Sequence, residues 1–87
     1  MPLQGAQPLS DLKIYKTIDA TSENCAGPIG ELAGAMNDAY VGEGVTIILG
    51  DEATRDDILV WASRTGNEIV GNTSEGGRFT LVLRKVK

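Results

Sequence analysis

A single thiol is the side chain in this sequence best suited to chemistry. Cys25 is the one cysteine among 87 residues, and there is no histidine. Gly27 and Pro28 follow it and lead into a segment with apolar residues at helical spacing, so we expect the sulfur at or just before a helix N-terminus. First-turn N–H groups lack intrahelical partners, and the peptide dipoles place partial positive charge there. This position therefore favours the thiolate form of Cys25.

The groups that usually accompany a catalytic thiol are missing from the composition. Without histidine no Ser-His-Asp or Cys-His arrangement can form, and one cysteine supplies no second thiol for disulfide chemistry. The glycines of 42–44 and 76–77 do not open a helix as a phosphate-binding loop does, and no metal-ligand spacing occurs. We therefore expect no metal and no cofactor. If Cys25 is reactive, its thiolate alone can still accept sulfur from a persulfide and pass it on, and such a protein is a carrier.

A second interpretation of Cys25 stays open. Lone free cysteines often act as small buried hydrophobic residues, and the nearby carboxylate of Glu23 disfavours a thiolate. If Cys25 is merely structural, the chain is a noncatalytic interaction or regulatory module with the same fold. The two interpretations differ in whether the thiol is accessible in the folded protein.

Charge and hydropathy restrict the partners. The formal net charge is −4, which argues against direct binding to nucleic acid, although Arg78, Arg84 and Lys85 could form one local positive face. The sequence has no apolar run long enough to span a bilayer, and its first residues do not resemble a signal peptide. A single unpaired thiol persists best in a reducing compartment. We therefore expect a cytoplasmic protein without a membrane partner.

Hydrophobic periodicity predicts six elements after a flexible N-terminal tail at residues 1–12. The remaining residues, 13–87, form a single domain. Thr54 and Asp57 have the spacing of a capping box at the start of the second helix, which Gly66 ends, and the acidic residues around them cap that helix. Trp61 is expected in the core. The expected elements are a strand at 13–19, a helix at 29–40 with Pro28 in its first turn and Gly42 after it, a central strand at 45–49 buried on both faces, a helix from Thr54, and strands at 67–73 and 78–86.

This order predicts the fold class. A strand-helix-strand unit favours a parallel pair, whereas the final hairpin must be antiparallel. The sequence therefore predicts a two-layer α/β sandwich of order β-α-β-α-β-β, with a four-stranded mixed sheet and both helices on one face.

The whole pattern resembles the TusA, or SirA-like, family of small sulfur carriers, from about Ile18 to Val86. The resemblance rests on Asp19, Cys25-Ala26-Gly27-Pro28, Gly42-Glu43-Gly44, Asp51, Asp57-Ile58, Trp61, Gly66 and Gly77-Arg78-Phe79. The family signature is Cys-Pro-X-Pro, and this chain keeps the second proline while Ala26 replaces the first. Proline at that position would fix φ and pre-organise the first turn, so Ala26 gives a looser start.

The resemblance implies a function for the thiol. It implies that Cys25 carries sulfane sulfur as a persulfide or a thiosulfonate and relays it to a partner protein. It also implies sulfur donors such as cysteine desulfurases, rhodaneses or DsrE-like proteins. The protein would then be a component of a sulfurtransferase system rather than an independent enzyme.

Overall fold

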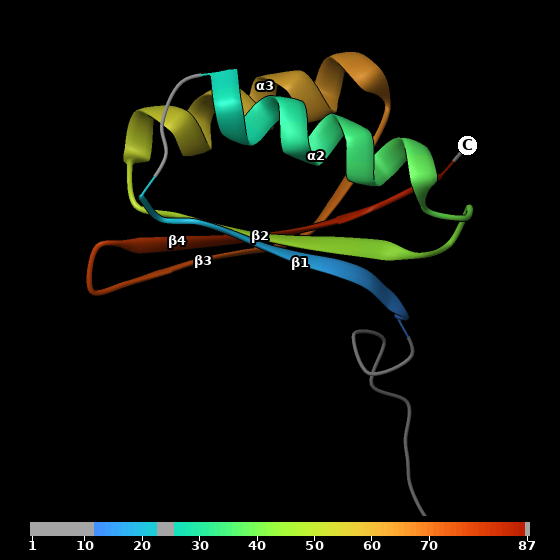
Figure 1. The fold of residues 1–87 in the computed structure, drawn as a ribbon, viewed down its shortest axis with the longest axis horizontal. Coiled ribbons are helices and arrows are strands. Elements are labelled where there is room, and N and C mark those ends of the chain that lie inside the picture. Colours follow the sequence, from blue (N-terminus) through green and yellow to red (C-terminus); the bar gives the residue numbers. More distant parts are fainter. Residues whose placement is uncertain (1–11, 23–25, 87) are drawn as a thin grey trace, which may run out of the picture.

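The computed structural model describes residues 12–22 and 26–86, and its six elements follow the expected order (Figure 1). The strands and helices alternate up to the final hairpin. Their bounds are β1 Ile14–Ala20, α2 Ala26–Asp38, β2 Gly44–Leu49, α3 Glu52–Thr65, β3 Glu68–Glu75 and β4 Arg78–Arg84. No helix in these two ranges is long and apolar enough to cross a membrane.

The four strands form one mixed sheet in the order β1-β2-β4-β3. β1 and β2 are parallel, and β4 pairs antiparallel with both β2 and β3. Figure 1 shows α2 and α3 together on one face of this sheet. The predicted fold class is therefore confirmed.

The hydrophobic core lies between the helices and the sheet. Alternate residues of each central strand point into it, as the period of two requires. Trp61 is partly buried and packs against this cluster, as expected. The fully buried large side chains include Leu32 of α2, Ile58 of α3, Ile47 and Leu49 of β2, and Leu81 and Leu83 of β4.

The second face of the sheet is open, which corrects one prediction. We expected β2 to be buried on both faces because residues 45–49 form an almost continuous apolar run. β2 is indeed central, but Thr46 and Ile48 are partly exposed while the alternate residues are buried. Both helices pack on the same side, so nothing in the described residues covers the other.

Two helix boundaries also differ from the sequence prediction. α2 begins at Ala26 rather than near Ile29, and it ends at Asp38, before Gly42. Gly42 has a φ of 95°, but it serves the turn into β2 instead of ending the helix. Gly66, with a φ of 79°, does end α3 as predicted.

The final hairpin is tighter than the sequence suggested. β3 extends to Glu75, which pairs with Arg78, so the loop consists of Gly76 and Gly77 alone. Their φ values are 59° and 81°. Two positive values in succession are what a two-residue type I′ loop needs, and glycine adopts them without steric cost.

Candidate functional site

The candidate site is the end of the domain where β1 and β2 finish and both helices begin. Cys25 itself lies outside the described residues, so the site is built from its described neighbours. We call this end the thiol pole and define it by residues 19–22, 26–28, 50–56 and 78–79. Figure 1 shows that α2 and α3 both start at this end of the sheet. Because α2 begins at Ala26, its first residue is the one bonded to Cys25.

The chain leaves β1 through a turn fixed by Asp19. Its Oδ1 accepts hydrogen bonds from the Thr21 hydroxyl at 2.8 Å and from the Thr21 backbone N–H at 3.1 Å. These bonds stabilise the carboxylate and, with a smaller contribution from the charge of Arg78, lower the pKa of Asp19. These bonds fix the turn in which the chain leaves β1.

Gly50 lets the turn after β2 approach the turn after β1. A Cβ built on Gly50 would lie 2.6 Å from the Thr21 carbonyl oxygen, which is closer than real Cβ atoms come to backbone. Glycine is therefore required at this contact. The sequence signal for this role was weak, since Gly50 looked like an ordinary turn residue.

The first turn of α2 suits an anion. Pro28 is fully buried and lacks an N–H, which costs nothing in a turn whose N–H groups have no intrahelical partners. Within the described residues, this turn holds no acidic side chain that would compete for its partial positive charge. The first turn of α2 therefore offers partial positive charge to an anion that lies near its start.

The start of α3 corrects the predicted capping box. The N-cap is Asp51, not Thr54, and its Oδ2 accepts from the Thr54 backbone N–H and the Thr54 hydroxyl, each at 3.0 Å. Thr54 is 2% exposed, so its hydroxyl depends on this partner. Asp51–Thr54 and Thr54–Asp57 have the same spacing, which is why the sequence pattern selected the wrong pair.

Arg55 brings positive charge to the thiol pole, and the sequence analysis missed it. Its Nε donates to Asp56 at 2.8 Å and its Nη2 lies 3.3 Å from Glu52 Oε2. Its guanidinium carbon lies 5.1 Å from the centre of the Phe79 ring, a cation–π arrangement. The available signal was a single arginine in the first turn of a helix otherwise rich in acids.

The predicted positive face of Arg78, Arg84 and Lys85 is not formed as one patch. Arg78 and Arg84 are the first and last residues of β4, so they are about 20 Å apart along the strand. Arg84 pairs with Glu68, and the Lys85 ammonium donates to the carbonyl oxygens of Asn37 and Ala39 at 3.2 and 2.9 Å. Arg84 and Lys85 make these contacts at the end of the domain opposite the thiol pole.

Arg78 instead lines a shallow hollow on the open face of the sheet. The hollow has a volume of about 210 Å³ and is lined mainly by polar side chains. Residues 12–22 and 26–86 bring together no group of three acidic or thiol side chains that could hold a metal ion. The lining residues are Ile48, Thr73, Ser74, Glu75, Arg78 and Thr80.

Together these features define a small two-layer α/β domain in which a helix begins at the residue bonded to the single cysteine of the sequence. Residues 16–85 match the family model described as "Sulfurtransferase TusA". The chain therefore belongs to the TusA family, as its sequence pattern suggested, and this family supports a sulfur-carrier role.

Curated relatives agree with this assignment over most of the chain. A putative sulfur carrier protein of Archaeoglobus fulgidus is 31% identical over 70 residues, covering 80% of this chain and 96% of the relative. The sulfur carrier protein TusA of Allochromatium vinosum is 31% identical over 68 residues, covering 78% and 90%. That of Pseudomonas entomophila is 31% identical over 77 residues, covering 88% and 96%.

Proposed function

We propose that the protein carries sulfane sulfur on Cys25 and relays it between partner proteins. The observation that carries this proposal is the start of α2 at the residue bonded to Cys25. A first turn with unpartnered N–H groups and no acidic side chain stabilises the anion that the chemistry requires. Family membership supplies the sulfur-carrier role that this anion would serve.

The transfer needs no group beyond the partners' own thiols. The Cys25 thiolate attacks the terminal sulfur of a donor persulfide, which forms a Cys25 persulfide and releases the donor thiolate. An acceptor thiolate then attacks the terminal sulfur of that persulfide and releases the Cys25 thiolate. Each step breaks one S–S bond and makes another, so the pair of steps has no net oxidation.

The local structure supports presentation of the sulfur rather than catalysis by neighbours. Asp19 fixes the turn after β1, and Gly50 lets the turn after β2 approach it closely. Arg55 lies at the same pole, in ion pairs with Glu52 and Asp56. The donor and acceptor would supply any further acid, base or cofactor. Donors of the cysteine desulfurase, rhodanese or DsrE-like classes meet this requirement, and we place the exchange in the cytoplasm, where thiols stay reduced.

Sulfur loading followed by relay tests the proposal. The purified protein is incubated with a small-molecule persulfide or with tetrathionate, and its intact mass is measured before and after reductant. We expect an adduct that reductant removes, and for the persulfide it equals one sulfur atom. The loaded protein should then pass the sulfur to an acceptor thiol.

The controls separate carriage from incidental oxidation. Cys25→Ser must take up no sulfur, and its unchanged thermal unfolding shows that the substitution leaves the fold intact. A folded wild-type protein that takes up no sulfur, while the same chain loads in denaturant, would show that Cys25 is structural. That result would favour the noncatalytic module.

A further inference from the structure

Glutamate and arginine face each other twice across β3 and β4, once near each end of the ladder. The register places Glu68 opposite Arg84 and Glu75 opposite Arg78. The first pair is closed, because Glu68 Oε1 lies 2.6 Å from Arg84 Nη2 and 2.7 Å from its Nε. In the part of the chain that the structure describes, no ion pair engages Glu75 or Arg78. The same two residue types are thus joined at one end of the ladder and separate at the other.

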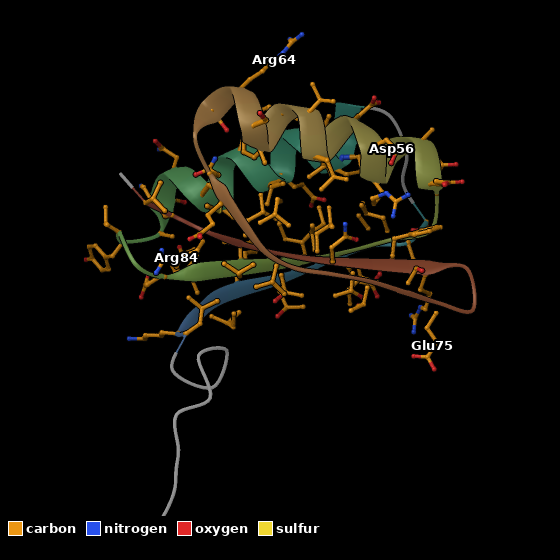
Figure 2. The ribbon with its side chains drawn as sticks, turned by 180° about the vertical axis from the view of Figure 1, so that it is seen from behind. Asp56, Arg64, Glu75 and Arg84 are labelled. Carbon is orange, nitrogen blue, oxygen red and sulfur yellow. The ribbon has the colours of Figure 1, made fainter. Side chains whose placement is uncertain are left out.

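The open pair borders the hollow on the exposed face of the sheet. Glu75 and Arg78 line it together with Thr73, Thr80 and the partly exposed Ile48. Thr80 is paired with both Thr73 and Ile48, and directly opposite residues share a face of the sheet. Arg78 lies two residues from Thr80, on that same face, and Figure 2 shows Glu75 pointing away from the helices. The hollow therefore combines a cation, an anion, two hydroxyl groups and one apolar side chain.

This combination restricts the ligand that the hollow can hold. A lone anion would be attracted by Arg78 and repelled by Glu75, and a lone cation would meet the reverse. A molecule with a carboxylate and an ammonium group satisfies both, because guanidinium groups bind carboxylates through paired hydrogen bonds and carboxylates accept from ammonium. Asp19 is a further acid within the electrostatic range of Arg78, but its Oδ1 already accepts two bonds from Thr21. The charges therefore favour a zwitterion.

The dimensions of the hollow favour a small zwitterion. The Cβ atoms of directly opposite residues are about 4.5–5.5 Å apart, so a ligand that bridges Glu75 and Arg78 needs its own charges close together. The volume of about 210 Å³ is below the roughly 300–1,000 Å³ of pockets for drug-sized ligands. The apolar side chain of Ile48 suits a short aliphatic group. These are the properties of an α-amino acid with a short side chain.

We propose that the hollow binds a free α-amino acid whose carboxylate pairs with Arg78 and whose ammonium group pairs with Glu75. The hydroxyl groups of Thr73 and Thr80 complete the hydrogen bonding, and Ile48 contacts the short side chain. Arg78 also belongs to the thiol pole, so the bound molecule would lie beside that end of the domain. Binding requires no thiol chemistry and does not depend on the proposed function.

An NMR titration tests the site. L-Alanine is added to the isotope-labelled full chain, and the backbone amide signals of residues 73–80 are followed. We expect a saturable shift of these signals. Binding should be weaker by about tenfold or more for L-alaninamide, which lacks the carboxylate, and for N-acetyl-L-alanine, which lacks the ammonium group. No saturable shift with L-alanine would overturn the proposal, and so would equal binding of N-acetyl-L-alanine, which would indicate a simple anion site.

Matched substitutions on the same two strands identify the charges that bind. Arg78→Gln and Glu75→Gln should each weaken L-alanine binding by about tenfold or more, whereas Arg84→Gln and Glu68→Gln at the closed pair should leave it unchanged. All four side chains are exposed, and thermal unfolding checks that each variant folds. Cys25→Ser should bind as wild type, so amino-acid binding and sulfur carriage can fail separately. Equal losses at the two pairs would overturn the proposal, because they would indicate a general effect of charge.

Discussion

Different kinds of contact stabilise the two ends of this domain. The thiol pole combines short-range hydrogen bonds, such as that of Asp19 with Thr21, with one close approach between distant residues, Gly50 against Thr21. The opposite end, where α2 ends and β2 begins, is fixed by backbone hydrogen bonds between segments far apart in the sequence, such as Gly42 with Lys85. At the thiol pole a single glycine therefore decides how closely two turns approach, whereas the other end distributes its long-range contacts over several backbone hydrogen bonds.

The largest effect is expected from Gly50→Ala at the thiol pole. The new Cβ would meet the Thr21 carbonyl at 2.6 Å, and a backbone atom cannot move away cheaply. We expect a loss of roughly 1–3 kcal/mol in the free energy of unfolding, together with slower sulfur loading. Chemical denaturation and the loading assay measure the two effects.

The matched control for that substitution is Gly30→Ala in α2, where nothing lies within 4 Å of the new Cβ. Alanine should stabilise that helix by about 1 kcal/mol. If both variants were equally stable, the close approach of the two turns would not constrain the thiol pole.

Asp51→Ala should have the next largest effect. It removes the α3 cap and leaves the buried Thr54 hydroxyl without its partner, so we expect about 1 kcal/mol of destabilisation or somewhat more. Asp57→Ala, at the other carboxylate with capping-box spacing, should change stability little. If Asp57→Ala lost as much unfolding free energy in urea as Asp51→Ala, the assignment of Asp51 as the cap of α3 would be contradicted.

Lys85→Met tests the opposite end. The ammonium group donates to two carbonyl oxygens at the end of α2, and its loss should cost about 0.5–1 kcal/mol in thermal unfolding. Sulfur loading should be unchanged because the thiol pole is untouched. A large loss of loading at unchanged stability would contradict the independence of the two ends.

Asp19→Asn should give the smallest effect, and one that depends on pH. Because the pKa of Asp19 is lowered by its bonds to Thr21, its contribution to stability is present above the unfolded pKa near 4 and is lost as the pH falls through the folded pKa. We expect a lower midpoint than wild type at pH 7 and convergence below pH 4. A difference that stayed constant over this range would assign the effect to something other than ionisation.

Much of this fold could be predicted from the sequence, because periodicity in segments such as 45–49 and 78–86 is a local property. The position of β4 between β2 and β3 could not, since pairing between distant strands leaves no local pattern. The basic face failed to form for a different reason, which is the geometry of a single strand. Arg78 and Arg84 are close in sequence, but a strand puts its ends far apart.

The candidate site was predictable in part. The helix after Cys25 follows from Pro28 and the apolar spacing, although α2 starts earlier than expected because proline is tolerated throughout a first turn. Gly50 and Arg55 were missed because their roles depend on Thr21 and Phe79, which are distant in sequence. Only the assembled structure shows such contacts.

The alkylation rate of Cys25 as a function of pH tests the central claim most directly. We expect the folded protein to react with iodoacetamide, and the midpoint of its pH profile to lie below that of the same chain in denaturant. Such a shift means that the start of α2 stabilises the thiolate. A folded protein that resists alkylation while the denatured chain reacts, or a midpoint above the denatured one, would contradict the account.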